Sequence, residues 1–219
     1  MSATEVGARS AGGVRVEKVT TSGVFCLDDG EWEVDNNVWL VGDDEHVIVV
    51  DAAHDAAPIV EAIGGRSVVA IALTHGHNDH INAARDLSDA VGAPVWLSPA
   101  DRMLWDGQFG SAPDRELVDG TELSVGDVTL QALATPGHSP GGTCLYAASL
   151  GVVLSGDTLF AGGPGATGRS YSDFGTIIDS IRDRLLALPP DTAVLTGHGD
   201  STTIGAEAPH LPEWVARGH

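Results

Sequence analysis

The sequence predicts an α/β protein with helices outside and sheet inside, on three grounds. Strand and helix patterns alternate in both halves of the 219 residues, which is typical of layered α/β folds. The run SVVAIALT (residues 67–74) is continuously apolar, as expected for a strand buried on both faces. A hydrophobic content of 42% at this length suits one sizeable core. We therefore predict a single domain over residues 1–219, with residues 1–13 as a flexible N-terminal extension.

The first half opens with strands. Residues 14–53 predict a meander of short strands, because Asp-Gly, Asn-Asn and Gly-Asp-Asp turn signals separate the β-branched runs. The helix expected next has Pro58 near its start and glycine after its end. The elements expected in the rest of this half are a helix at 58–65, a strand at 67–74, a helix at 82–92 and a strand at 93–97.

The second half repeats this organisation with a different sequence. Residues 121–135 predict a hairpin that turns at Gly126 and Asp127. Two more strands, within 142–148 and 151–157, precede an amphipathic helix at 172–188. A last strand is expected at 192–199, so the interleaved pattern continues to the end of the chain.

Charge and composition exclude several classes of function. The formal net charge of −20 disfavours nucleic acid as a partner, because that affinity depends largely on Lys and Arg neutralising phosphates. No stretch approaches the roughly 18 apolar residues of a membrane span, and the N-terminus lacks the apolar core of a signal peptide. We expect a cytoplasmic protein that acts on a small molecule. Cys26 and Cys144 have no framework spacing, so reduced, buried thiols are predicted.

The stretch LTHGHNDHI (residues 73–81) is the strongest functional signal. His75, His77, Asp79 and His80 follow the pattern H-x-H-x-D-H. Two histidines one residue apart in an extended chain point to the same side, and a turn into a helix brings the other two back beside them. Imidazole and carboxylate suit zinc and other first-row metals, so this segment predicts a metal site.

Three further candidate ligands follow apolar strands downstream. His138 lies in ATPGHSPGG, Asp157 in VVLSGDTLF and His198 in VLTGHGDSTT, and glycines beside each let the backbone approach closely. Strand ends that are distant in sequence can gather at one edge of a sheet, so we expect one site.

This order and spacing resembles the five-part signature of the metallo-β-lactamase superfamily over about residues 16–205. The resemblance implies a four-layer αββα sandwich with two divalent metal ions at one edge, between the sheets. It implies that the hydroxide bridging the two ions attacks the substrate and that Asp79 also acts as a general base. It allocates His75, His77 and His138 to one ion, Asp79, His80 and His198 to the other, and Asp157 to both.

Two segments resemble the glyoxalase II-like (hydroxyacylglutathione hydrolase-like) subgroup. Residues 155–174 contain its G-D-T-L-F-x-G stretch, and TGHGDSTTIGAE resembles its closing motif. The resemblance implies hydrolysis of a thioester of a low-molecular-weight thiol, with Arg169 and Tyr171 contacting the carrier. Glyoxalase II proper has a C-terminal helical extension that this chain lacks, so mycothiol or another bacterial thiol is a carrier to consider beside glutathione.

Other interpretations stay open at this stage. GRSYSDF (168–174) resembles a loop of persulfide dioxygenases, which use a single iron, and lactonase activity or a catalytically silent metal-binding domain is also compatible. Hydrolysis of β-lactams ranks low, because many lactam-cleaving members have cysteine or serine where this chain has Asp157. Asp51 and His54 are expected to support the ligands from behind. Zinc is the favoured ion, with iron and manganese as alternatives, and the oligomeric state is open.

Overall fold

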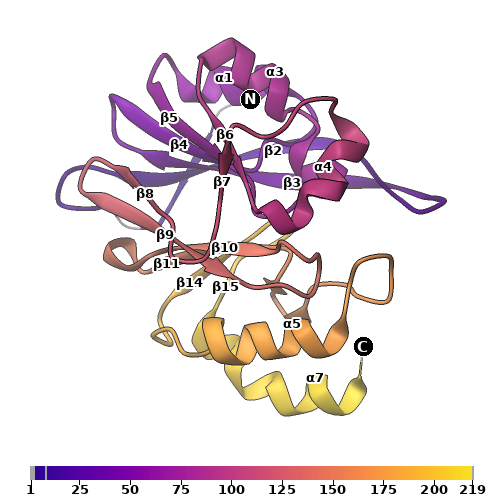
Figure 1. Ribbon diagram of the computed structural model, residues 1–219. Helices are drawn as coiled ribbons and strands as arrows, with labels where there is room; N and C mark the ends of the chain where they lie inside the picture. Colours follow the sequence, from indigo (N-terminus) through magenta and orange to yellow (C-terminus); the bar gives the residue numbers. More distant parts are fainter. Residues whose placement is uncertain (1–2, 8, 219) are drawn as a thin grey trace.

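Two β-sheets pack face to face in the computed structural model, which describes residues 3–7 and 9–218 (Figure 1). The first sheet has the strand order β1-β2-β3-β4-β5-β6-β7, antiparallel as far as β4 and parallel beyond it. Its strands are β1 (Thr4–Val6), β2 (Arg15–Leu27), β3 (Gly30–Gly42), β4 (His46–Val50), β5 (Ser67–Ala72), β6 (Val95–Leu97) and β7 (Arg115–Glu116).

The second sheet has the strand order β15-β14-β11-β10-β9-β8. Its strands are β8 (Glu122–Val125), β9 (Val128–Ala134), β10 (Thr143–Ala147), β11 (Val152–Gly156), β14 (Ala193–Thr196) and β15 (Thr202–Thr203). A separate pair, β12 (Leu159–Phe160) and β13 (Gly163–Pro164), lies between β11 and the helices that follow. The predicted hairpin at 121–135 is confirmed as β8 and β9, which turn at Gly126 and Asp127.

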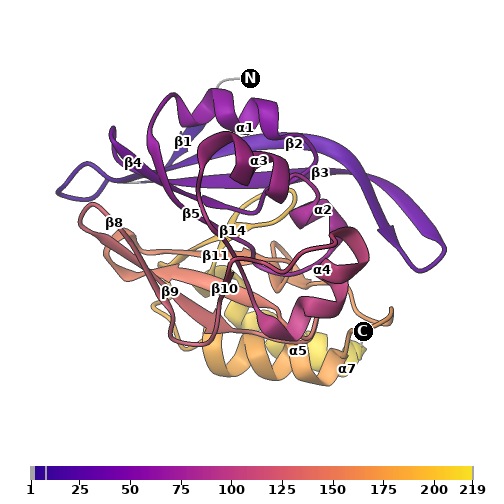
Figure 2. The ribbon, with the colours of Figure 1, turned by 45° about the horizontal axis from the view of Figure 1, so that its top comes forward.

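Helices cover the outer face of each sheet (Figures 1 and 2). Helices α1, α3 and α4 lie over the first sheet, and α5 and α7 lie over the second. The helices are α1 (Ala56–Ile63), α2 (Asn78–Ile81), α3 (Ala84–Val91), α4 (Arg102–Gln108), α5 (Phe174–Ser180), α6 (Ile204–Glu207) and α7 (Leu211–Arg217), with a π-helical turn at Ile181–Leu185 after α5. The predicted αββα sandwich is therefore confirmed. Among these described helices, none combines the length and apolar character needed to cross a membrane.

Three hydrophobic clusters lie between the layers of the sandwich, one between the sheets and one between each sheet and its helices. The alternation of side chains along a strand determines which cluster each residue joins. Along β3, Trp39 and Val41 point into the space between the sheets, whereas Val38 and Leu40 pack under the helices of the first sheet. Both sets are buried, which is why this part of β3 is apolar without alternation. A third cluster joins the second sheet to α5 and α7 through Ile177 and Trp214. The sheets are thus fixed on both faces.

The opening segment differs from its prediction. Residues 15–42 form one long hairpin of two 13-residue strands, whose tip extends beyond the body of the molecule (Figure 2). Asn36 and Asn37 lie inside β3 and are buried, instead of forming a turn. They tolerate burial because their amides have partners: Asn37 Nδ2 donates to the carbonyls of Thr196 and Gly199, and Asn36 contacts Asp79.

The expected flexible extension is also different in the structure. Thr4–Val6 pair with β2, and both Ser10 Oγ and Gly12 N donate to the carboxylate of Asp127. Met1, Ser2 and Ala8 of that extension lie outside the described residues.

Other boundaries and exposures differ as well. The helix predicted at 172–188 begins only at Phe174, because Asp173 caps it by accepting from Thr176 N. Helices α4 and α7 had no sequence prediction. Cys144 is buried as expected, whereas Cys26 is exposed.

Trp39 provides a test of how strongly the sheets are joined. Its ring is buried between them, and its Nε1 donates to the carbonyl of Thr196 on β14 at 3.0 Å. We expect Trp39→Ala to lower the free energy of unfolding by about 3–5 kcal/mol, through the cavity it leaves. Urea denaturation of the metal-free protein measures this. Trp32→Ala, at a ring that is 36% exposed, serves as the control and should cost about 1 kcal/mol or less.

Candidate metal centre

The candidate ligands come from strand ends of both sheets. His75 and His77 follow β5, and Asp79 and His80 lie in α2, which begins directly after them. The other three ligands follow or connect strands of the second sheet: His138 lies between β9 and β10, Asp157 after β11 and His198 after β14. All seven lie together at one edge of the sandwich, as the sequence predicts.

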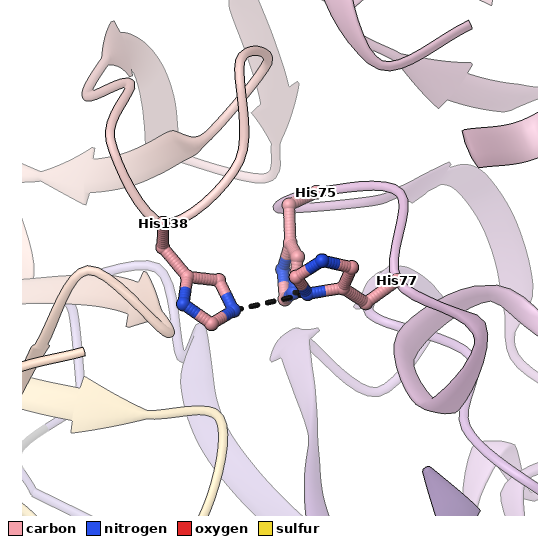
Figure 3. Close-up of side chains that lie close together, drawn as sticks. All are labelled: His75, His77 and His138. Atoms are coloured by element: carbon pink, nitrogen blue, oxygen red, sulfur yellow. Dashed lines mark hydrogen bonds between the residues drawn. The ribbon is translucent and has the colours of Figure 1, made fainter. Parts of the chain in front are cut away.

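Three histidines form the first group. His75 Nε2 and His138 Nε2 each lie 3.0 Å from His77 Nδ1. Figure 3 shows His138 reaching across from its loop toward the other two rings. His75 and His77 are buried, so the three nitrogens converge in a place that water does not fill readily.

Asp79, His80 and His198 form the second group. His198 Nε2 lies 3.2 Å from both His80 Nε2 and Asp79 Oδ2. Asp157 lies between the two groups, because its carboxylate oxygens are 3.4 Å from His80 Nε2 and 3.6 Å from His138 Nε2. One carboxylate therefore faces ligands of both groups.

In His138 and His198, the ring nitrogen that faces away from the site makes a hydrogen bond to the protein. His138 Nδ1 donates to the carbonyl of Ala166, and His198 Nδ1 donates to the carbonyl of Asp35, each at 2.8 Å. These bonds place a proton on Nδ1 and direct Nε2 into the site. Such outward bonds are typical of metal-bound histidines.

Asp51 contacts His80 directly and His75 through Thr74. Its Oδ2 lies 2.8 Å from His80 Nδ1 and also accepts from the hydroxyl of Thr74, whose oxygen is 3.1 Å from His75 Nδ1. Asp51 has a positive φ of 59° and is buried. This strained backbone is held by the bond from Thr74 N to Asp51 Oδ1.

His54 contacts the site through Asn36, a residue that the sequence analysis missed. Asn82 Oδ1 accepts from His54 N, so the Asn82 amide nitrogen faces His54 Nδ1. His54 Nε2 is then the protonated nitrogen and donates to Asn36 Oδ1 at 2.7 Å. The Asn36 amide nitrogen donates in turn to Asp79 Oδ2 at 3.1 Å.

Burial and charge act differently on the two groups. Burial, together with His138 beside it, lowers the pKa of His77 to about 3, and burial lowers the pKa of His75 well below its usual value. Both rings are therefore neutral. Against the effect of burial, Asp157 and Asp79 raise the pKa of His198 to about 10. The second group thus strongly favours a positive charge.

The residues present fit a pair of cations. Asp79 Oδ1 and Asp157 Oδ1 are buried without a hydrogen-bond partner, although buried polar atoms normally have one. The donor set of imidazoles and carboxylates is the set that zinc and iron accept. Three groups of potential ligand atoms overlap here: His75, His77 and His138; His75, His80 and Asp157; and Asp79, His80 and His198.

The two predicted substrate contacts differ in position. Arg169 lines a cavity of about 40 Å³ beside His77 and His138, and its guanidinium carbon lies 3.9 Å from the centre of the Trp32 ring. Tyr171 is 56% exposed, has a φ of 69° and is not part of that lining. The cavity has a mainly apolar wall formed by Phe25, Leu27 and Ala166.

The closing TTIGAE motif is structural. Thr203 Oγ1 caps α6 by accepting from Ala206 N, and Gly205 packs against Pro190, where a Cβ would lie 2.8 Å from the carbonyl oxygen. The Glu207 carboxylate accepts from Thr202 Oγ1 and from Gly162 N in the turn between β12 and β13. The motif therefore joins the C-terminal helices to that turn.

Comparison with known proteins agrees with this geometry. The family model described as the metallo-beta-lactamase superfamily matches residues 32–198. The hydroxyacylglutathione hydrolase GloC of Haemophilus influenzae is 34% identical over 188 residues, which cover 78% of this chain and 89% of that protein.

Two solved structures have the same fold at appreciable identity. The BLEG-1 B3 metallo-beta-lactamase has a TM-score of 0.76 at 29% identity, covering 89% of this chain and 99% of its own. TTHA1623 in a di-iron-bound form has a TM-score of 0.73 at 34% identity, covering 80% of this chain and 93% of its own.

A substitution at Gly197 tests the site without replacing any candidate ligand. A Cβ there would lie 2.3 Å from Asp157 Oδ1 and 2.7 Å from His80 Cε1. We expect Gly197→Ala to displace both side chains and weaken binding of the metal by about 10- to 100-fold, the range for disturbed ligand support. Metal titration against a chelator measures it.

Gly107→Ala is the matched control. Gly107 is exposed in α4, and no atom lies within 4 Å of an added Cβ. Metal affinity should be unchanged, with stability raised by up to about 1 kcal/mol. Equal metal binding by both variants would contradict the assignment of this edge as the metal centre.

Proposed function

The chain belongs to the metallo-β-lactamase superfamily, and on that basis we propose that it is a dinuclear metal-dependent hydrolase that cleaves thioesters of a low-molecular-weight thiol. The observation that supports it most directly is the position of Asp157, whose carboxylate faces ligands of both groups at 3.4–3.6 Å. We assign His75, His77 and His138 to one cation, Asp79, His80 and His198 to the other, and Asp157 to both.

The chain contributes orientation and proton transfer to the reaction. When bound, two divalent cations supply Lewis acidity and lower the pKa of a shared water toward about 7. Asp79 Oδ2 accepts from Asn36 Nδ2, so the carboxylate of Asp79 is held in one orientation toward the site, where it would accept a proton. Asp51, through His80 and Thr74, keeps the ligands oriented throughout.

A thioester suits this arrangement for a chemical reason. A thiol has a pKa of about 8.5, so thiolate departs from a tetrahedral intermediate without first being protonated. The reaction then needs one proton acceptor, which Asp79 can provide. The G-D-T-L-F-x-G stretch and the 34% identity to a hydroxyacylglutathione hydrolase support the same substrate class.

Arg169 is the residue we propose to hold the thiol carrier. It lines the cavity beside His77 and His138, and among the described residues its guanidinium forms no ion pair with a carboxylate. In a chain with a net charge of −20, an unpaired cation at this position favours a carrier with a carboxylate group. Tyr171, exposed beside it, can contact only the outer part of such a carrier.

Zinc is the resident ion we propose, because four of the five histidines direct Nε2 and one directs Nδ1 into the site. Iron suits the same donors, and the TTHA1623 structure carries two irons. Elemental analysis of the isolated protein distinguishes the two.

Thioester hydrolysis is the principal test of the proposal. We expect about two metal ions per chain, loss of activity toward lactoyl and formyl thioesters on chelation, and recovery when metal is restored. Asp157→Ala should lower kcat/KM by about 100-fold or more, equivalent to about 2.7 kcal/mol, because both cations lose a ligand. A thiol-release assay and elemental analysis measure the two effects.

Parallel assays separate the alternatives. A lactone and a β-lactam test the other hydrolase activities, the latter because of the structural similarity to BLEG-1. Oxygen uptake with a persulfide and one iron per chain would indicate a dioxygenase. Two bound ions with no turnover in any assay would indicate a catalytically silent domain.

Arg169 gives a separate test of carrier recognition. We expect Arg169→Ala to raise KM about 10-fold (about 1.4 kcal/mol) for thioesters whose carrier has a carboxylate, through loss of a charge-assisted hydrogen bond. Esters of an uncharged thiol should be unaffected. Arg182→Ala, at an exposed arginine paired with Asp179 and Asp183, is the control. An unchanged KM for every ester would remove Arg169 from the substrate site.

A further inference from the structure

Asp101 is a buried carboxylate that joins the two loops of the three-histidine group. It is fully buried, at the residue before α4. Its Oδ2 accepts from Gly76 N and from Ser139 Oγ, each at 2.7 Å, and its Oδ1 accepts from Gly141 N at 2.5 Å. Gly76 lies between His75 and His77, and Ser139 follows His138, so one carboxylate connects the two loops that carry all three histidines.

The glycines of both loops permit this contact. A Cβ on Gly76 would lie 3.0 Å from Asp101 Cβ, and a Cβ on Gly141 would lie 2.6 Å from Asp101 Cγ. Real Cβ atoms essentially never approach as closely as 2.6 Å, so any side chain at Gly141 would push the loop away from the carboxylate, and a Cβ on Gly76 would also lie 2.9 Å from Leu104 Cβ. The glycine within H-G-H and the one directly after Ser139-Pro140 thus have a specific steric reason.

No cation of the described residues neutralises Asp101. Arg102, its neighbour in sequence, pairs with Asp106 on the exposed side of α4. A buried carboxylate without a counter-charge is costly, even when N–H and O–H groups satisfy it. Because both carboxylate oxygens accept hydrogen bonds from the loops, a neutral amide would set its Nδ2 against one of these N–H donors, so the connection itself uses a carboxylate. A cation at the three-histidine group would offset the cost of burying that charge.

We propose that Asp101 is a positioning residue for the three-histidine group, which fixes the separation of its two loops and adds a negative charge behind them. This inference rests on the proposed metal centre. His75, His77 and His138 contribute no formal charge and Asp157 is shared between both cations, so a divalent cation at this group gains from a further carboxylate behind the loops. Asp101 touches neither the cation site nor the substrate.

Two single-ligand variants serve as genetic backgrounds, and each leaves only one of the two ligand groups intact. His198→Ala removes a ligand of the second group, and His77→Ala removes one of the first. We expect Asp101→Asn, which keeps the shape but removes the charge and one of the two accepting oxygens, to weaken Zn²⁺ binding by about 10- to 100-fold in the His198→Ala background. In the His77→Ala background the affinity should stay within about twofold, as for independent sites. Chelator competition on metal-free protein gives both values.

Two further variants separate charge from folding. Asp106→Asn, on the exposed face of α4, should change neither affinity. Ser139→Ala removes one hydrogen bond and keeps the carboxylate, so its loss should also be confined to the His198→Ala background and should be smaller than that of Asp101→Asn. Because Ser139→Ala leaves the buried charge in place, it tests the inference even where Asp101→Asn fails to fold.

Three outcomes would overturn the inference. Equal losses in both backgrounds would show a general effect on folding, and unchanged affinity in the His198→Ala background would show that Asp101 does not act on the first group. In either case the proposed hydrolase still stands. A wild-type protein that binds no Zn²⁺, Fe²⁺ or Mn²⁺ would instead refute the proposed metal centre, and this inference with it.

Discussion

The convergence of imidazole nitrogens at one edge of the sandwich is the constraint on which the surrounding structure depends. His75 Nε2 and His138 Nε2 each lie 3.0 Å from His77 Nδ1, and burial keeps the rings of His75 and His77 neutral, so three polar ring nitrogens are crowded together with few protons to share. Such an arrangement is unfavourable unless a cation binds there or the surroundings hold the rings in place. The surroundings do hold them, because each loop that carries a ligand is attached to rigid structure behind it.

Those attachments come from both sheets, so the sandwich itself determines the geometry of the site. Asp51, at the end of β4, orients ligands that follow β5, while the carbonyl of Asp35 in β3 orients His198 from the second sheet. Trp39 and Asn37 bind the same carbonyl of Thr196, the last residue of β14. A shift of one sheet against the other would therefore move ligands of both groups, and the inter-sheet core prevents that shift.

How much the sequence could predict depends on where each partner lies. The clustering of the seven candidate ligands was predictable, because H-x-H-x-D-H and three later residues follow apolar strands in an order and spacing that resembles the superfamily's signature. Asn36 was not, since Asn-Asn is an ordinary turn signal and only tertiary contacts keep it in a strand. Asp101 was also missed, because two of its three donors are backbone N–H groups 25 and 40 residues away, and backbone donors carry no sequence pattern.

The cavity beside the candidate metal centre is formed by a different part of the molecule from the candidate ligands. Those ligands lie at strand ends, whereas the cavity is lined by residues of the β2–β3 hairpin and of the loop that carries Arg169. Ser170 Oγ donates to Asp28 Oδ1 at 2.6 Å, so these two segments are joined directly. Both are surface segments that can change without disturbing the sandwich. In the proposed reaction, the ligand set would therefore supply the chemistry, and the residues of these two segments would recognise the substrate.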